Sequence, residues 1–423
     1  MTETAIPRGD EATRGRRGTN LPRMGDFNQS LILDEIRRSR TGLSRVQLAG
    51  TTKLSAQTIS NICRRLLDTG LIREAGKEGV GPGKPRTILR LNAEGRYAIG
   101  VHLDPTVITF VVLDLTGTIV SRHREATPVA SDPQHVVDTI VTATRALIEK
   151  SGVDRSRIAG IGIAAPGPID TARGAVIDPP NLAEWHRVAL RDSLAEATGL
   201  PAVLDKDVTA AAVAEMWAGG DQGFESFIFV YLGTGIGVGT VLDGDVLRGT
   251  SGNAGEVGHI VVDPDGPPCA CGQHGCVAVT STPRTLVEEA ERLGVLPRDR
   301  TTNDAGSIDD GFTALCVAAT AGDSTALEIL ERSASRITRA VAVVANMLDV
   351  DRVIFGGPTW SRLAPFYLPA VPSILEDLRA TRSIHPIRIQ GTTVGDEVGA
   401  VGAACLILDH TLTPRANMLL LGD

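Results

Sequence analysis

The chain has 423 residues, too many for one hydrophobic core, so we expect two or three domains. Its composition is that of a globular protein, and no apolar run approaches the ~20 residues that a membrane-spanning helix needs. Six cysteines are too few for a disulfide scaffold, and the N-terminus lacks the apolar stretch of a signal peptide. The sequence therefore predicts a cytoplasmic protein.

The net charge of −8 is unevenly distributed along the chain. Residues 1–98 carry 18 Lys and Arg against 10 Asp and Glu, a net of +8, so the remainder carries 24 against 40, a net of −16. A basic N-terminal part on an acidic remainder predicts that the N-terminal part meets a polyanion and that the rest does not.

The N-terminal quarter of the chain contains two predicted regions. Residues 1–24 are polar, rich in Arg and Gly and without apolar periodicity, which predicts a disordered arm. Residues 25–95 predict a winged helix-turn-helix domain. Helical periodicity begins at Asn28, Ser44 is the expected N-cap of a short second helix, and Ser55 that of a third. The runs LIREA and TILRLN, joined by a Gly- and Pro-rich loop, predict a β-hairpin.

The third of these helices predicts contact with double-stranded DNA. Its outward face carries small or hydrogen-bonding side chains that can approach base edges, and it ends in a cation suited to phosphate. The hairpin loop adds further basic residues. The alternative is a small helical domain that holds a partner or dimerises. The residues expected at the DNA are Ser55, Gln57, Thr58, Asn61, Arg64, Lys84 and Arg86.

From Tyr97 onward, strands alternate with helices, which is typical of an α/β body. Residues 97–120 and 227–247 each form the pattern of strand, turn, strand, turn and strand, so the body contains an internal duplication. Two such halves with a ligand between them are the layout of the two-lobed actin-like, ribonuclease-H-like ATPase fold. In that fold, the first turn of each half grips nucleotide phosphates. We expect residues 96–410 to adopt it and to serve effector binding and oligomerisation.

The stretch GHIVVDPDGPPCACGQHGC, residues 258–276, concentrates ligands for a soft metal. It offers one imidazole and three thiolates, which would fill a tetrahedral Zn²⁺ and leave no position open for water. The pattern therefore predicts a structural zinc site that pins a Gly- and Pro-rich loop. His274 is a rival ligand, and a reducing compartment disfavours a disulfide. The expected ligands are His259, Cys269, Cys271 and Cys276.

Over about residues 24–410, the sequence resembles the ROK family (repressors, open reading frames and sugar kinases), specifically its transcription-regulator branch. The resemblance rests on several motifs together. These are LSAQTISNICRRLLDTGLI, GIAAPGPID, PPNLAEW, YLGTGIGVG, GNAGEVGH with CACGQHGC, and RVIFGGP. The family's own zinc motif has the same Cys-x-Cys spacing.

The first turn of the body departs from the family's kinases, which carry Asp-x-Gly-Gly-Thr at this point. Asp104 would place a carboxylate where phosphates sit, and Pro105 has no N–H to donate. The second turn, Leu232–Gly237, is intact, but glycines also serve tight hairpins. The sequence therefore predicts that the protein is not an ATP-dependent kinase. The residues that replace the kinase turn are His102, Leu103, Asp104, Pro105 and Thr106.

The resemblance implies a sugar site built from an Asn-Asp pair, a Glu-x-Gly-His motif and a Glu two residues beyond the last cysteine. In the family's kinases, the Asp of this pair is the general base. Here Lys206 replaces the Asn and Ala278 the closing Glu. Lys206 either neutralises Asp207 as an ion pair or binds an anionic effector such as a sugar phosphate. A third alternative is that no small molecule binds and that a protein partner sets the conformational state of the body. The expected effector residues are Asn181, Lys206, Asp207, Glu256 and His259.

These features predict a transcription regulator, a repressor of carbohydrate-related genes, whose kinase-like body senses a sugar or sugar-derived effector without phosphorylating it. A homodimer or homotetramer would place two DNA-binding domains on a palindromic operator. One alternative is a sugar kinase with a DNA-binding appendage, and another is a scaffold whose body recruits a second protein.

Overall fold

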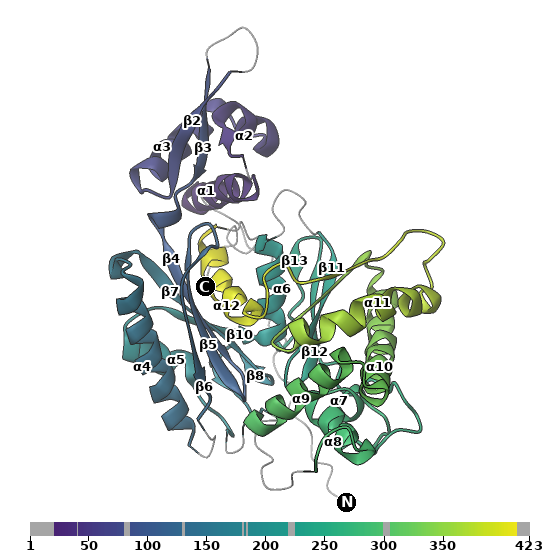
Figure 1. The fold of residues 1–423 in the computed structure, drawn as a ribbon. Coiled ribbons are helices and arrows are strands. Elements are labelled where there is room, and N and C mark those ends of the chain that lie inside the picture. The colour runs from purple at the N-terminus through teal and green to yellow at the C-terminus, as the bar shows by residue number, and fades with distance from the viewer. Residues whose placement is uncertain are drawn as a thin grey trace, which may run out of the picture.

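The computed structural model describes residues 21–39, 41–79, 85–128, 132–179, 182, 185–218, 225–298 and 305–412. An N-terminal head, residues 21–95, stands at one end of a two-lobed body, residues 97–412 (Figure 1). None of the helices in these ranges combines the length and the apolar character needed to cross a membrane.

The head has the helices and the hairpin that the sequence predicted. Ser44 begins the second helix with a capping box to Gln47, and the Ser55 hydroxyl begins the third by accepting from the Thr58 N–H at 3.1 Å. The core of the head is a set of buried aliphatic side chains shared by the helices and the hairpin. The elements are α1 (Leu21–Arg38), β1 (Leu43–Ser44), α2 (Arg45–Thr52), α3 (Ala56–Asp68), β2 (Ile72–Glu78) and β3 (Arg86–Leu91).

Helix α1 begins earlier than the sequence predicted. It starts at Leu21, inside the segment 1–24 that was expected to be a disordered arm. Pro22 lies in its first turn, where a missing N–H costs no helix hydrogen bond. Met24 is 44% exposed, and apolar periodicity in the sequence does not reveal this start of the helix. Residues 1–20 lie outside the described residues.

The first lobe of the body is a five-stranded sheet in the order β10-β7-β4-β5-β6. β4, β5 and β6 form an antiparallel meander, whereas β7 and β10 add to β4 in parallel. Helices α4 and α5 cover its outer face (Figure 1). The elements are β4 (Tyr97–Leu103), β5 (Val107–Asp114), β6 (Ile119–Ala126), α4 (Pro133–Ser151), β7 (Ile158–Ala165), the short pair β8 (Ile169–Asp170) and β9 (Ala175–Val176), α5 (Leu190–Thr198) and β10 (Ala202–Lys206).

The second lobe repeats this arrangement, with its sheet in the order β13-β12-β11-β14-β15. An antiparallel meander is again followed by two parallel additions, so the predicted duplication is confirmed. The elements are β11 (Phe227–Leu232), β12 (Ile236–Leu242), β13 (Asp245–Val246), α7 (Val277–Thr280), α8 (Pro283–Leu293), α9 (Ala305–Thr320), α10 (Ser324–Leu348), β14 (Arg352–Gly356), α11 (Trp360–Leu378) and β15 (Arg388–Gly391).

Two apolar helices, α6 (Asp207–Ala218) and α12 (Val398–Leu412), lie side by side between the two sheets (Figure 1). Glycines allow this close approach: a Cβ on Gly402 of α12 would overlap the carbonyl oxygen of Ala210 in α6. A Cβ on Gly399 would come within 2.8 Å of the His102 ring at the end of β4. The two helices therefore contact the cleft-facing end of the first lobe directly.

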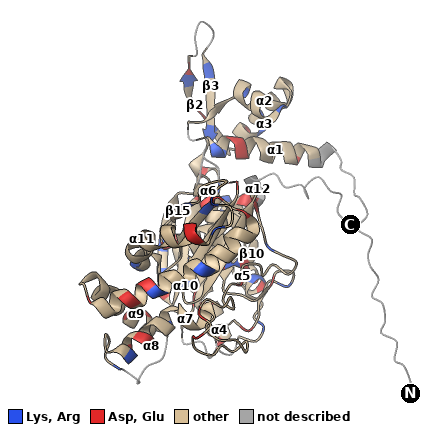
Figure 2. Ribbon diagram, turned by 90° about the vertical axis from the view of Figure 1, so that its right-hand side faces the viewer, with Lys and Arg blue, Asp and Glu red and all other residues tan. Residues whose placement is uncertain are grey.

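The head rests on the body through α1, which contacts α12. The Arg37 guanidinium lies 4.6 Å from the centre of the Trp217 ring, which belongs to the last turn of α6. Asp34 is buried and holds Arg37 and Arg38 at 2.6 and 2.8 Å. Figure 2 shows this junction from the side, with the head above the ends of α6 and α12.

Candidate functional site

A cavity of about 1120 Å³ lies between the lobes. The first lobe contributes the turn after β4 and the end of β10, and α6 contributes residues of its first turn. The second lobe contributes the turn after β11, helix α8 and the loop of residues 258–276 that carries the expected metal ligands, called here the metal-site loop. Of the expected effector residues, the structure brings four to this cavity. They are Lys206, Asp207, Glu256 and His259.

Lys206 forms an ion pair with Glu256 and not with Asp207. Its side chain is 3% exposed, whereas that of Glu256 is 63% exposed, so a buried ammonium reaches across the cleft to a carboxylate at the cavity surface. The Asp207 carboxylate turns instead to the Val208 N–H at 2.8 Å. The sequence offered an ion pair between Lys206 and Asp207 as one alternative. In the structure Lys206 pairs with Glu256 instead, because β10 and the second lobe place Glu256 opposite Lys206.

Asp207 is the first residue of α6 and lines the cavity. Burial raises the pKa of its carboxyl to about 7, and the charges of Asp104 and Glu256 raise it further against the opposing effect of Lys206. A carboxyl with this pKa is partly protonated at neutral pH. It can accept a hydrogen bond from a ligand hydroxyl or donate one to it.

The two turns that would hold phosphates in a kinase instead contact each other. The His102 Nε2 and the Tyr231 hydroxyl are 2.9 Å apart, and both side chains are buried. Beside them, the Thr234 hydroxyl donates to Asp104 Oδ2 at 3.3 Å, and the Thr106 N–H donates to Asp104 Oδ1 at 2.8 Å. These bonds occupy the polar groups of the first turn.

Burial sets the ionisation of the groups between the turns. It lowers the pKa of His102 to about 4, with a smaller contribution from Arg124, so the imidazole is neutral at physiological pH. Burial also raises the pKa of the Asp104 carboxyl, against the hydrogen bonds from Thr106 and Thr234. The imidazole is neutral and the Asp104 carboxylate is already hydrogen-bonded, so these two side chains offer no positive charge to a phosphate.

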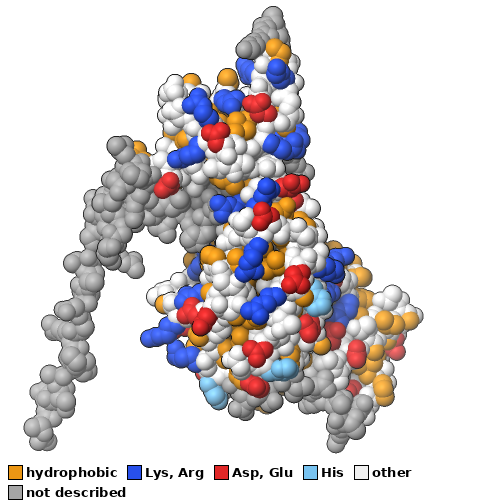
Figure 3. All heavy atoms as spheres, turned by 90° about the vertical axis from the view of Figure 1, so that its left-hand side faces the viewer, with side chains coloured by type: hydrophobic (Ala, Val, Ile, Leu, Met, Phe, Trp, Pro, Cys, Tyr) orange, Lys and Arg blue, Asp and Glu red, His pale blue; other side chains and the backbone are white. Residues whose placement is uncertain are grey.

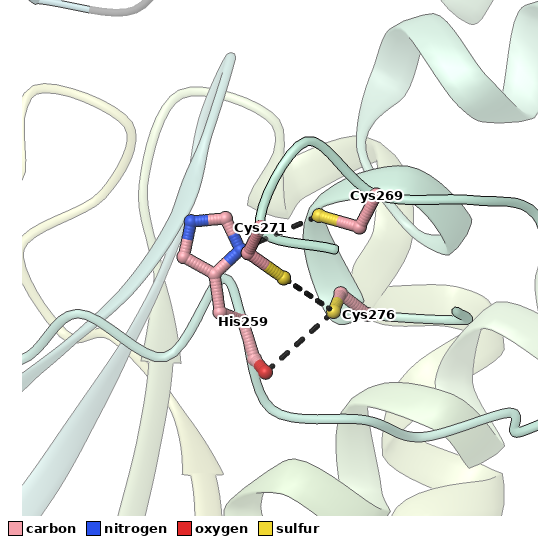
Figure 4. A group of neighbouring side chains, drawn as sticks. All are labelled: His259, Cys269, Cys271 and Cys276. Atoms are coloured by element: carbon pink, nitrogen blue, oxygen red, sulfur yellow. Dashed lines mark hydrogen bonds between the residues drawn. The ribbon is translucent and has the colours of Figure 1, made fainter. Parts of the chain in front are cut away.

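The expected metal ligands come together on one side of the cleft (Figure 4). Their ligand atoms all lie within 4.8 Å of one another, with Cys271 Sγ and Cys276 Sγ 3.7 Å apart and Cys269 Sγ and His259 Nδ1 3.4 Å apart. Two thiolates on one tetrahedral Zn²⁺ would be about 3.8 Å apart, given Zn–S bonds of about 2.3 Å. The donor set and its spacing therefore fit a four-coordinate metal.

The loop that carries these ligands is anchored from outside. Arg336 of α10 holds Asp263 at 2.6 Å, and Arg339 of the same helix donates to the Val262 carbonyl at 3.0 Å. His274, the rival ligand, is not in the cluster but faces the Gly266 carbonyl at 3.4 Å.

The outer face of α3 presents the residues that were expected at DNA. Gln57, Asn61 and Arg64 are exposed, and the Gln57 Nε2 donates to Asn61 Oδ1 at 3.0 Å. The hydroxyls of Ser55 and Thr58 are 2.9 Å apart at the helix start. Arg86 is exposed at the start of β3. Figure 3 shows Lys and Arg side chains spread over the visible face of the head, with fewer acidic ones among them.

Two expected residues lie outside the described residues: Asn181 of the effector set and Lys84 of the DNA set. Sequence reasoning also missed several residues that the fold brings into play. Tyr231 lies in a strand of apolar residues, and no spacing marks it as the partner of His102. Arg248 binds the buried Asp205 across the lobes at 2.8 Å, again without a local signal.

Comparison with known proteins identifies the family. The family model described as the ROK family matches residues 98–410. The chain belongs to the ROK family. Among ROK relatives, a putative xylose repressor of Caldicellulosiruptor sp. is 27% identical over 393 residues, which cover 91% of this chain and 96% of the relative. A glucokinase of Thermotoga maritima is 31% identical over 315 residues, 74% of this chain and 97% of the relative.

A solved ROK structure extends the comparison to the fold. The crystal structure of a ROK family transcriptional regulator, described as a homolog of the Escherichia coli Mlc protein, superposes with a TM-score of 0.75 at 22% identity. It covers 92% of this chain and 98% of its own. The match to the glucokinase covers a smaller part of this ROK chain than the matches to the repressor and the regulator do.

Proposed function

We propose that the protein is a DNA-binding transcription regulator, a repressor of carbohydrate-related genes, whose body senses a sugar or sugar-derived effector without phosphorylating it. One observation carries the proposal: a winged-helix head and a kinase-like body share a chain in which the first phosphate turn has lost its glycines. The similarity to a putative xylose repressor over 91% of the chain supports it.

The head supports binding to double-stranded DNA. Gln57, Asn61 and Arg64 lie on the exposed face of α3, where amide groups suit base edges and a guanidinium suits guanine or phosphate. Ser55 and Thr58 at the helix start, with Lys84 and Arg86 in the wing, complete the proposed contact set. A homodimer or homotetramer would present two heads to a palindromic operator.

Selection from a random-sequence DNA pool with the full chain tests this proposal. We expect an enriched palindrome, and Gln57→Ala should weaken binding to it by about 1–3 kcal/mol. Gln134→Ala is the matched control, because Gln134 makes the same kind of exposed amide contact, 2.9 Å to Asp138, on α4 of the body. No enrichment, or equal losses in both variants, would contradict the proposed DNA interface.

The cleft supports an effector site and disfavours kinase chemistry. Asp104 occupies the first turn and is bonded to Thr234 of the second, so both turns are engaged with each other. Both turns line the cleft cavity, the first with Asp104 and Pro105 and the second with Thr234 and Gly235. A phosphate bound between them would meet the Asp104 carboxylate and would receive no N–H from Pro105.

A coupled ATPase assay with several hexoses separates the regulator from the alternative, a sugar kinase with a DNA-binding appendage. We expect no turnover above the rate without sugar. Sugar-dependent turnover that disappears in Asp207→Ala would support the kinase instead. Titration with neutral and phosphorylated sugars tests the effector: binding of phosphorylated sugars alone, lost in Lys206→Ala, would identify Lys206 as the anion site.

Two helices support coupling between cleft and head. α6 starts at Asp207 in the cavity and ends beside Arg37 of the head, a span of about 18 Å for a 12-residue helix. α12 starts beside His102 and continues to α1. We propose that a ligand which shifts the lobes also shifts these helices, and with them the geometry of paired heads.

His259, Cys269, Cys271 and Cys276 would hold Zn²⁺ as a structural ion. When bound, the metal would supply a cross-link between the cleft wall and a Gly- and Pro-rich loop. Elemental analysis of purified protein should give one zinc per chain, and Cys271→Ser should abolish it while the head stays folded. Protein without metal that binds DNA and effector normally would contradict this role. A cytoplasmic location, where the thiols stay reduced, is part of the proposal.

A further inference from the structure

The cleft cavity is much larger than one sugar unit. A monosaccharide has about twelve heavy atoms, and even at the ~30 Å³ that a liquid water molecule takes, these would fill no more than about 360 Å³. The cavity of about 1120 Å³ therefore continues well beyond the group formed by Lys206, Asp207 and Glu256.

Ala278 lines the same cavity with only a methyl group. Its N–H donates to the Gly258 carbonyl at 2.9 Å, which places it beside His259 at the inner group. The ROK resemblance implies a glutamate at this position, where a long carboxylate would project from the same wall. With a methyl group there instead, the inner end of the cavity is continuous with the part lined by α8.

The outer part of the cavity is polar, and its charges are balanced. The Thr285 hydroxyl donates to the Thr282 carbonyl at 2.9 Å, and its oxygen lies 3.3 Å from the Thr282 hydroxyl. Arg292 lies 3.4 Å from Glu289 within α8, so the charges on this wall partly cancel. Arg336 is likewise paired with an acidic residue of the metal-site loop. Hydrogen-bonding groups without a net charge suit hydroxyl groups better than a phosphate or a carboxylate.

We infer that the cleft takes a neutral disaccharide or longer glycoside, with one sugar unit at Asp207 and the next against α8. This inference rests on the proposed effector function and names its ligand class. The unit at α8 gains contacts with Thr285 and with the exposed side chain of Glu288, both of which line the cavity. Ala278 determines the length of ligand that fits, because its side chain borders the passage between the two parts.

Calorimetric titration of the full chain tests the inference with matched probes: glucose, xylose and N-acetylglucosamine against cellobiose, xylobiose and chitobiose. We expect at least one dimer to bind about tenfold tighter than its monosaccharide, equivalent to about 1.4 kcal/mol. A monosaccharide that binds as tightly as its dimer, with DNA binding intact, would overturn the inference and leave the proposed function standing. If no sugar binds at all, the effector part of the proposed function fails as well.

Two substitutions at one position make the test specific. Ala278→Glu should reverse the preference, because its carboxylate blocks the passage and adds a hydroxyl partner to the inner unit; the dimer is then lost while the monosaccharide binds better. Ala278→Ser is the control and should keep the dimer preference. Glu288→Ala should weaken only the dimer. A general loss of folding would weaken both ligands, so a dimer preference that survives Ala278→Glu overturns the inference.

Discussion

The two turns that face each other across the cleft hold equivalent positions in a duplicated fold but differ in chemistry. The second, Leu232–Gly237, keeps its glycines, whereas the first presents His102, Asp104 and Pro105. At the first turn, the carboxylate of Asp104 and the missing N–H of Pro105 both oppose the binding of a phosphate. The side chains of the first turn form hydrogen bonds to the opposite lobe instead: His102 with Tyr231, and Asp104 with Thr234.

The largest effect on this contact is expected from Tyr231→Ala. The Tyr231 side chain is 3% exposed, so its removal leaves a cavity and an unpaired His102, and we expect the free energy of unfolding to fall by about 3–5 kcal/mol. Urea denaturation at pH 7 measures it. Tyr231→Phe keeps the ring and should cost only about 1–3 kcal/mol. No loss of stability in Tyr231→Phe would mean that the hydroxyl bond is irrelevant.

A pH dependence should follow from His102. Its pKa is lowered from 6.5 to about 4 in the folded state, so between these values the unfolded chain binds a proton that the folded chain does not. Stability is therefore fully present above about pH 6.5 and falls by about 3 kcal/mol as the pH drops to about 4. Urea denaturation across this range checks it. His102→Asn should remove this component, and an unchanged pH profile in that variant would contradict the assignment.

The hydrogen bond between Thr234 and Asp104 should contribute less to the free energy of unfolding than the one between Tyr231 and His102. Thr234→Val removes the hydroxyl that donates to Asp104, but Asp104 keeps the Thr106 N–H, so we expect a loss of about 1 kcal/mol in thermal or urea unfolding. Thr234→Ser retains the hydroxyl and should behave like the wild type. A loss as large as that of Tyr231→Phe would show that the two bonds contribute equally.

The smallest effect is expected on Asp207, whose pKa is raised mainly by burial and additionally by the charge of Asp104. Asp104→Asn removes that charge, so the pKa of Asp207 should fall by a fraction of a unit. Carbon-13 NMR of the carboxyl group measures the titration, with Thr234→Ser as a control that leaves the charge in place. An unchanged or higher pKa would mean that the two carboxylates do not interact across the cleft.

Local patterns were enough to predict the elements of the fold. Strand and turn spacing revealed the duplication at residues 97–120 and 227–247, because period-two alternation and turn residues are local properties. Ser44 and Ser55 marked two helix starts for the same reason. The candidate metal-binding cluster could also be predicted, since three of its four residues lie within eight residues of one another. The start of α1 at Leu21 could not be predicted, because residues 1–24 show no apolar periodicity in the sequence.

What the sequence by itself determined is the order of elements, the candidate metal-binding cluster and the residues of the first turn, all encoded within short segments. Only the tertiary structure decided that Lys206 pairs with Glu256 and that Tyr231 pairs with His102, residues 50 and 129 positions apart. It also placed α8 along the cleft cavity and brought Trp217 beneath Arg37. These contacts depend on how two lobes and a head pack, and no periodicity along one segment carries that information.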